Sequence, residues 1–378
     1  MNFDFDEQQV ELHSTVARAL ADALPFETHE MRGSDDSAAW DMMAELGLFG
    51  ILVPEAHGGL GLSLVDLALI AEELGTRLAP QSIIDTLVAA DVIARHASER
   101  QRGEWLAALA SGGLRVALAW HEAGAGYEPS RMTTTFRDGV LSGEKILVAH
   151  AAAADWLLVP FRHGDSVRTG LAMVPAGAKG VTRARSESVD PSCDHHKVLF
   201  NRVAIAPAAI LDGRAPQDAA ARLFDVAAAL FSAAALGIAG EMVRRSAEYA
   251  RERVQFDKPI GSFQAIKHKC ADMYTQVVAA RAAAYYAVCV LSEMGEDGPR
   301  GASMAKAFCV DTAVECCHQG IQVHGGMGFT WELGLHHFLR RARILAASFG
   351  DSDFHRERVI EATLEQAALA AEEARSAA

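Results

Sequence analysis

The residues with the clearest capacity for chemistry lie in the run RVQFDKPIGSFQAIKHKCAD, residues 253–272. Arg253 is a permanent cation, and its planar fork suits the oxygens of a phosphate. Phe256 offers an aromatic face or a packing wall, and Gln264 offers an amide that both donates and accepts hydrogen bonds. On these residues alone, a surface arginine beside a buried phenylalanine at a helix-end turn is the simpler interpretation.

A second run, QVHGGMGFTWE, covers residues 322–332 and places two glycines shortly after Gln322. Gly325 and Gly326 would let the backbone approach a ligand closely and present N–H groups to a phosphate. A plain helix C-cap explains the two glycines equally well. Because both runs occur in one chain, the combination is more specific than either run alone.

Composition excludes several classes of protein. The chain has 378 residues, of which 50% are hydrophobic and 22% charged, as in a globular protein of two or three domains. Its formal net charge of −14 argues against binding to nucleic acid or to an anionic membrane. It has no uninterrupted apolar run of about 18 residues, so we expect no membrane span. The acidic N-terminus lacks the order of a secretion signal, and we expect a cytoplasmic protein.

Neither metal nor disulfide chemistry is expected. The cysteines show no CxxC spacing, and most sit among apolar neighbours in helical patterns, so buried reduced thiols are the simplest interpretation. The histidine pairs 195–196 and 336–337 lack further ligands at metal spacing. The cysteines are Cys193, Cys270, Cys289, Cys309, Cys316 and Cys317.

Periodicity divides the chain into three regions. Up to about residue 112, apolar residues recur at helical spacing. Between about residues 114 and 211, short β-rich segments such as GVLSGEKILVA alternate with turns and predict an antiparallel barrel or sandwich. Beyond that, long alanine-rich patterns predict an antiparallel helical bundle that also forms a subunit interface. We therefore expect an α+β multidomain fold with an N-terminal helical domain (1–112), a middle β domain (113–212) and a C-terminal four-helix-bundle domain (213–378).

The two runs closely resemble the signature regions of the acyl-CoA dehydrogenase family, and the helical, β, helical order resembles that family's architecture over nearly the whole chain. The resemblance implies an FAD-dependent oligomer, a dimer or dimer of dimers, that acts in the α,β-desaturation of an acyl-CoA thioester. Electron-transfer flavoprotein is the implied electron acceptor. In the family, the neighbouring subunit largely holds the adenosine and pyrophosphate end of FAD. The residues that match those roles are Arg253, Phe256, Gln264, Gln322, Gly325 and Gly326. Asp257 departs from the pattern, which usually has glycine there.

The segment that resembles the family's flavin-ring side has lost most of its functional groups. The family's Thr-Glu-Pro-x-x-Gly-Ser-Asp segment aligns with residues 121–128, where His121 and Tyr127 replace hydroxyl residues. On the next strand, Leu147 takes the place of a tryptophan that stacks on the flavin. Ala149 takes the place of a threonine that hydrogen-bonds near its N5 atom. Stacking and a directed hydrogen bond are both expected to be absent.

The position of the catalytic base is also changed. Family members abstract the α-proton with a glutamate, and the position of this glutamate in most members corresponds to Phe349. In a minority the glutamate lies on the first long bundle helix, at about Ala227. Asp225 precedes Ala227 by two residues, which on a helix is about 200° away. Asp351 is better placed to cap the final helix.

Three functions fit these residues. The chain is a non-catalytic partner subunit of a hetero-oligomeric dehydrogenase, a self-sufficient dehydrogenase with Asp225 or Asp351 as a relocated base, or a non-redox acyl-CoA-binding protein. The first agrees best with a chain that keeps the adenosine side and loses the ring side. The sequence does not reveal which acyl group is involved.

Overall fold

The computed structural model describes residues 5–29, 33–211, 216–293 and 297–376. The first region is helical, as predicted. Two of its helices begin at capping boxes, formed by Asp6 and Gln9 at α1 and by Ser63 and Asp66 at α4. The helices are α1 (Glu7–Ala23), α3 (Ser37–Glu45), α4 (Leu64–Thr76), α5 (Gln81–His96) and α6 (Glu99–Ala110).

The middle region forms a curled seven-stranded sheet in the order β1-β4-β2-β3-β7-β6, with β5 paired to β4. Four pairings are antiparallel, but β4 runs parallel to both β1 and β2, so the sheet is mixed where an antiparallel one was expected. The strands are β1 (Val116–Leu118), β2 (Thr135–Arg137), β3 (Val140–Ala149), β4 (Trp156–His163), β5 (Thr169–Pro175), β6 (Val181–Arg185) and β7 (His195–Ala204).

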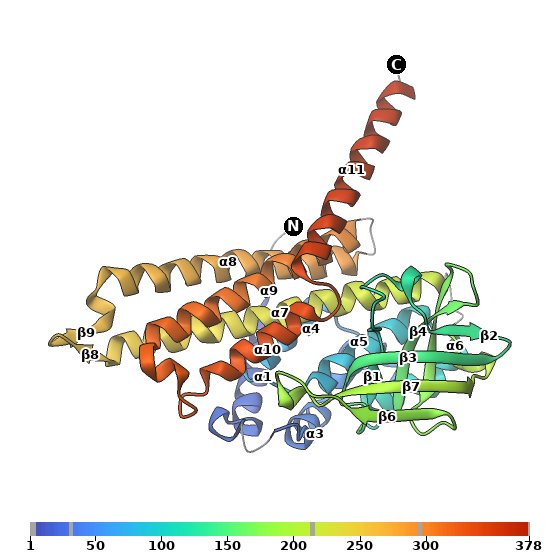
Figure 1. Cartoon of the computed structure of the whole chain (residues 1–378), viewed down its shortest axis with the longest axis horizontal. Coiled ribbons are helices and arrows are strands. Elements are labelled where there is room, and N and C mark those ends of the chain that lie inside the picture. Colours follow the sequence, from blue (N-terminus) through green and yellow to red (C-terminus); the bar gives the residue numbers. More distant parts are fainter. Residues whose placement is uncertain (1–4, 30–32, 212–215, 294–296, 377–378) are drawn as a thin grey trace.

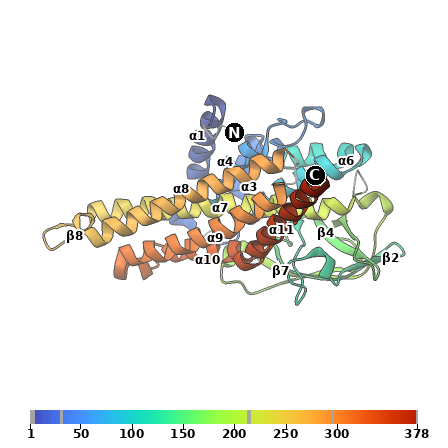
Figure 2. The same cartoon turned by 90° about the horizontal axis from the view of Figure 1, so that it is seen from above.

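The last region is built on three long helices that lie side by side (Figures 1 and 2). A short hairpin joins the first two and extends beyond their ends, whereas the sheet lies at the opposite end of the molecule. The final helix projects away from the body in Figure 1. The elements are α7 (Pro216–Glu252), β8 (Val254–Gln255), β9 (Lys258–Pro259), α8 (Gln264–Ser292), α9 (Asp297–His324), α10 (Leu335–Ala347) and α11 (Ser352–Ser376).

Small residues let α4 and α7 cross in backbone contact. A Cβ atom added at Gly75 would lie 1.9 Å from the carbonyl oxygen of Ala234, and one added at Gly237 would lie 1.9 Å from that of Glu72. Only glycine fits at these two points, so the crossing fixes the N-terminal helices against the bundle. The α+β architecture predicted from the periodicity is confirmed.

Two described helices, Ala219–Glu252 and Gln264–Ser292, are long and apolar enough to span a membrane by length and composition. In the first, 94% of the most apolar window is buried inside the protein, so its composition is that of a core helix. In the second, 44% is buried, and side chains such as Tyr274 and Val278 remain exposed.

Helix α5 carries two buried aspartates in contrasting surroundings. Asp91 is paired with Arg222 at 2.8 Å and with Arg95 at 3.0 Å. Among the described residues no cation pairs with Asp85, whose carboxylate has only two 3.5 Å contacts, with the Gln81 amide and the Leu118 N–H. Burial raises the pKa of Asp85 from 3.8 to about 8, so the folded protein holds this carboxyl protonated near neutrality.

We predict that Asp85→Asn raises the melting temperature, and increasingly so as the pH rises. Because the pKa of Asp85 is raised in the folded state, its contribution to stability is complete below about pH 4 and is lost as the pH rises through about 8. Asparagine has no such pH dependence. Thermal unfolding at pH 5 and pH 8 measures the difference, which should be larger at pH 8.

Asp91→Asn on the same helix is the matched control. It leaves the Arg222 guanidinium buried without its counter-charge, which costs about 3–5 kcal/mol. An equal loss of stability in both variants would contradict the assignment of Asp85 as an unpaired carboxyl.

Candidate functional site

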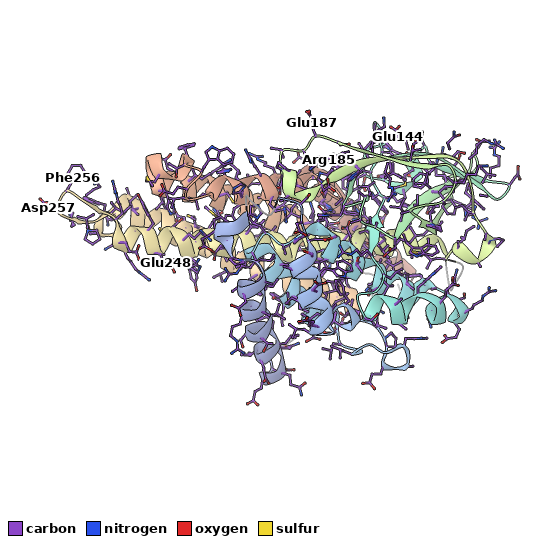
Figure 3. The ribbon with its side chains drawn as sticks, turned by 90° about the horizontal axis from the view of Figure 1, so that it is seen from below. Glu144, Arg185, Glu187, Glu248, Phe256 and Asp257 are labelled. Carbon is purple, nitrogen blue, oxygen red and sulfur yellow. The ribbon has the colours of Figure 1, made fainter. Side chains whose placement is uncertain are left out.

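The hairpin between α7 and α8 is closed by a two-residue turn formed by Phe256 and Asp257. Val254 pairs with Pro259 and Gln255 with Lys258. Both turn residues have positive φ, 53° and 61°, as a tight two-residue hairpin requires. Phe256 is 86% exposed, the largest value among the exposed large hydrophobic side chains of the described residues. The hairpin lies at one end of the molecule, far from Glu144 and Arg185 of the sheet (Figure 3).

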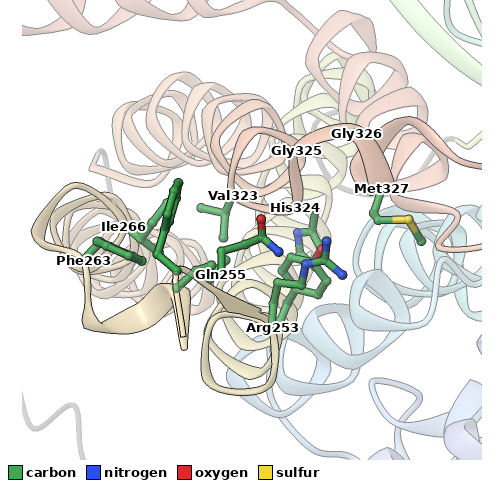
Figure 4. A pocket seen from close by; sticks show the side chains of 12 residues that line it. Arg253, Gln255, Phe263, Ile266, Val323, His324, Gly325, Gly326 and Met327 are labelled. Atoms are coloured by element: carbon green, nitrogen blue, oxygen red, sulfur yellow. The ribbon is translucent and has the colours of Figure 1, made fainter. Parts of the chain in front are cut away.

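A groove of about 550 Å³ opens between this hairpin and the end of α9, and we name it the hairpin groove (Figure 4). Arg253 and Phe256 contribute to one side, and Gly325 and Gly326 to the other. Four of the six residues predicted to hold the cofactor are therefore brought together. The groove is lined by Tyr249, Arg253, Gln255, Phe256, Ile260, Phe263, Ile266, Val323, His324, Gly325, Gly326 and Met327.

The other two predicted residues, Gln264 and Gln322, do not line the groove. Gln264 is the first residue of α8 and Gln322 lies in the last turn of α9, and both side chains are exposed. Each is next in sequence to a lining residue, Phe263 and Val323 respectively. They remain candidates for contacts at the rim of the groove.

The walls of the groove suit a flat polar ligand that carries negative charge. Gly325 has φ +58°, as a helix C-cap requires, and open space lies beside both glycines where a side chain would stand. Arg253 is exposed and forms no ion pair with any residue that the structure describes, so its guanidinium is available to an anion. The glycines are therefore compatible with both interpretations: they form the C-cap of a helix, and they leave space for a ligand to approach the backbone.

His324 and Tyr249 are two of the eight lining residues that were not among the predicted site residues. The His324 ring stacks on Tyr249, with ring centres 4.3 Å apart, and its Nδ1 contacts the Gly320 carbonyl at 2.8 Å. Burial lowers the pKa of His324, which favours the neutral imidazole. Tyr249 precedes Arg253 by one helical turn, so helical spacing could have placed it on the same face.

The segment that begins at His121 is anchored by a buried ion pair. Glu122 contacts Lys145 Nζ at 2.8 Å and accepts hydrogen bonds from the Thr133 hydroxyl at 2.6 Å and the Thr134 N–H at 3.1 Å. Although burial alone would raise it, Lys145 and these hydrogen bonds lower the pKa of Glu122 to about 2. Glu122 is thus a structural carboxylate, fully engaged inside the β region.

Phe349 lies at the centre of what we name the aromatic cluster. Its side chain is 2% exposed, and its ring centre lies 5.2 Å from Phe231, 5.3 Å from His121, 5.8 Å from Trp120 and 6.2 Å from Phe224. Close packing of these rings fills the space around position 349, where the family resemblance predicts the usual base. No carboxylate belongs to the cluster.

Buried nitrogen groups hold the turn that carries Phe349. Its N–H donates to His121 Nε2 at 3.3 Å, and His355 Nε2 donates to its carbonyl at 2.8 Å. Lys306 Nζ donates to the carbonyls of Leu345 and Gly350, each at 2.8 Å. Burial lowers the pKa of His121 and of His355 to about 3, so both rings are neutral. These bonds retain Phe349 at φ +52°, an uncommon conformation for a bulky residue.

Neither relocated aspartate is free to act as a base. Asp225 is buried and paired with Arg358 at 3.0 Å; burial raises its pKa, and Arg358 offsets part of the rise. Asp351 accepts the N–H of Phe354 at 2.9 Å, so it caps α11 as predicted. Asp351 also faces the Tyr127 hydroxyl, whose pKa is raised by burial and by this carboxylate.

A smaller groove of about 340 Å³ remains beside the aromatic cluster. Tyr127 and Phe354 lie on its wall with ring centres 5.2 Å apart, and Arg358 and Phe224 line it as well. Leu147 is exposed in a left-handed bulge of β3, and Ala149 is buried.

The hairpin groove and the aromatic cluster lie in different parts of the chain. The hairpin lies beyond one end of the long helices, whereas the cluster draws on the sheet side of the molecule and on the first part of α7 (Figure 1). The groove and the cluster are therefore formed by separate sets of residues.

Comparison with known proteins agrees with this architecture. The family model described as "Acyl-CoA dehydrogenase, N-terminal domain" matches residues 6–113, and "Acyl-CoA dehydrogenase, C-terminal domain" matches residues 218–364. Acyl-CoA dehydrogenase IpdE2 of Mycobacterium tuberculosis is 30% identical over 341 residues, which cover 89% of this chain and 91% of that protein.

Two solved structures are similar over almost their entire length. A variant of the Tcur3481-Tcur3483 steroid ACAD is 28% identical with a TM-score of 0.86, covering 96% of this chain and 99% of that one. The ChsE4-ChsE5 complex of Mycobacterium tuberculosis is 24% identical with a TM-score of 0.87, covering 97% and 99%, and shows the shared fold. The chain belongs to the acyl-CoA dehydrogenase family of flavin-dependent oxidoreductases.

Proposed function

We propose that this chain is the non-catalytic partner subunit of a hetero-oligomeric acyl-CoA dehydrogenase. In this role its hairpin groove holds the adenosine and pyrophosphate end of an FAD whose ring sits in the other subunit. The observation that carries the proposal is the contrast within one chain: the hairpin groove is open, whereas the base position is filled by the aromatic cluster. The names of two similar structures, Tcur3481-Tcur3483 and the ChsE4-ChsE5 complex, each join two different proteins, which supports a heteromeric arrangement.

FAD is the cofactor that family membership supports, and the residues present fit only its adenosine side. Arg253 offers a cation for the pyrophosphate, and the open backbone at Gly325 and Gly326 offers close approach. On the ring side, the Phe349 cluster leaves no carboxylate base, and Tyr127 packs against Phe354 and Asp351 where the family pattern has a small hydroxyl residue.

The division of labour follows from these contacts. When bound, the flavin supplies the hydride acceptor for α,β-desaturation of an acyl-CoA thioester. This chain binds and orients the nucleotide end, while the base and the ring contacts come from the catalytic subunit. Electron-transfer flavoprotein remains the proposed acceptor. A solved structure named for the electron transferring flavoprotein of Acidaminococcus fermentans contains a chain of the same fold.

The exposed apolar groups around the hairpin support a shared site. Phe256, Phe329 and Trp331 are 86%, 77% and 59% exposed, and all three belong to segments that form or adjoin the groove. Apolar surface of this kind marks an interface more often than free surface. A partner that covers the groove would bury it together with the ligand.

A self-sufficient dehydrogenase with a relocated base is the alternative. It requires Asp225 or Asp351 to leave its present partner, because the first is paired with Arg358 and the second caps α11. A non-redox acyl-CoA-binding protein would rely on the smaller groove beside Arg358. The experiments below distinguish these functions.

We predict that the isolated chain binds ADP, which is the adenosine and pyrophosphate part of FAD. Arg253→Ala should weaken this binding about tenfold or more, because a hydrogen bond to a charged group contributes about 1.5–3 kcal/mol. Isothermal titration calorimetry measures it. FMN, which lacks the adenosine half, should not bind.

Arg251→Ala is the matched control, because Arg251 is exposed in the last turn of α7, two residues before Arg253, and does not line the groove. Equal ADP affinity in the Arg253→Ala and Arg251→Ala proteins would refute the assignment of Arg253.

We predict that the chain purified alone is colourless after desalting and turns yellow only when co-purified with a catalytic dehydrogenase subunit. The visible absorption spectrum is the measurement, and the reason is that the ring side lacks room and partners for a flavin. Near one flavin per chain in the isolated protein would favour the self-sufficient alternative.

We predict that Phe349→Glu creates no dehydrogenase activity in the isolated chain and lowers its melting temperature. A carboxylate placed among Trp120, Phe224 and Phe231 is desolvated without a counter-charge. Phe349→Leu, which removes the ring but adds no charge, should lose less stability. Reduction of a dye by acyl-CoA substrates with the Glu variant alone would contradict the half-site assignment.

A further inference from the structure

The tip of the hairpin carries an unpaired negative charge. Asp257 is exposed and forms no ion pair with any residue in the described ranges. Its neighbour Lys258 does not neutralise it, because Lys258 Nζ lies over the ring of Phe263 at 4.5 Å from its centre. Phe256, at the other position of the turn, is the exposed aromatic residue of the tip. The tip therefore presents a carboxylate beside an apolar anchor.

The entrance to the aromatic cluster is also acidic. Asp351 and Asp353 flank the start of α11, and the Asp353 side chain is 91% exposed. Arg356 contacts Asp353 at 2.9 Å but is shared with Asp311, so two carboxylates compete for one guanidinium. Glu128 lies on the adjoining wall of the small groove and is about half exposed. The entrance thus holds more exposed acids than cations.

We propose that Asp257 selects the partner subunit, by excluding a second copy of this chain and favouring a subunit with a basic side chain at the corresponding entrance. The inference rests on the proposed function, in which the hairpin of one subunit meets the flavin entrance of the other. It specifies that the partner carries a basic side chain at its entrance, which the proposed function does not specify.

The exclusion follows from symmetry and charge. If two copies paired in this way, each Asp257 would meet the acidic entrance of the other copy, so the unfavourable contact would occur twice. Like charges brought together in an interface cost several kcal/mol, and a carboxylate buried there without a counter-ion adds its desolvation. A partner with lysine or arginine at that place removes both costs.

A charge-reversal cycle in the isolated chain tests the inference. Asp257→Lys alone, or Asp353→Lys alone, places opposite charges across the contact, and each should strengthen self-association by about tenfold or more. The double variant restores like charges and should return to the wild-type state. Sedimentation velocity at several concentrations measures the assembly, and high salt should weaken the gain in the single variants.

Asp138→Lys is the matched control, because Asp138 is also an exposed aspartate with positive φ, 51°, in the tight turn between β2 and β3. It should leave assembly unchanged. The inference is overturned if neither single variant strengthens self-association, if the double variant assembles as strongly as the single ones, or if Asp138→Lys has the same effect. It is also overturned if Phe256→Ser reduces the assembly of the wild-type chain, because two copies would then already pair through the hairpin.

ADP titration separates this inference from the proposed function. Asp257→Lys keeps Arg253 and should retain ADP binding. Failure of the wild-type chain to bind ADP would refute the proposed adenosine site, whatever the assembly shows. Normal ADP binding without the charge-reversal pattern would refute partner selection alone.

Discussion

The turn around Phe349 joins the β region to the helical bundle through buried hydrogen bonds. It lies where the sheet, α9, α10 and α11 meet, and its backbone is bonded to His121, His355 and Lys306. These three groups come from separate elements, so the turn ties the β region to the bundle. Once the backbone is fixed in this way, the side chain at position 349 must point into the aromatic cluster. An apolar ring there closes the ring side, and no small adjustment of a neighbouring aspartate reopens it.

The hairpin groove is open, in contrast to the closely packed aromatic cluster. The hairpin groove has a guanidinium without an ion-pair partner among the described residues, an accessible glycine backbone and an exposed aromatic tip. The groove and the aromatic cluster share no residue, so the hairpin groove would hold a nucleotide end without the rings of the cluster. This arrangement is the one that the proposed half-site requires.

Sequence patterns predicted the order of helical and β regions because hydrophobic periodicity reports which face of each segment is buried. The resemblance of the two runs to a known family also predicted that Arg253, Phe256, Gly325 and Gly326 come together, and the groove brings these four residues to one place. The parallel pairing of β4 with β1 and β2 was not predictable, since periodicity indicates strands but not their neighbours. Contacts between residues that lie far apart in the sequence were not predictable either. Nothing in the local pattern pairs Asp225 with Arg358, or stacks His324 on Tyr249.

The replacement of a carboxylate by Phe349 also changes the energetic balance of the chain. A catalytic glutamate in an apolar pocket is a desolvated charge that lowers stability, and it is tolerated because the reaction needs it. A buried phenylalanine instead contributes about 1.5–3 kcal/mol of hydrophobic stabilisation. The aromatic cluster therefore stabilises the subunit. The hairpin retains exposed apolar and charged groups that favour association. A chain with this distribution gains little from self-pairing at the aromatic cluster. It gains most from a partner whose ring side is open and whose entrance matches the charge of the hairpin.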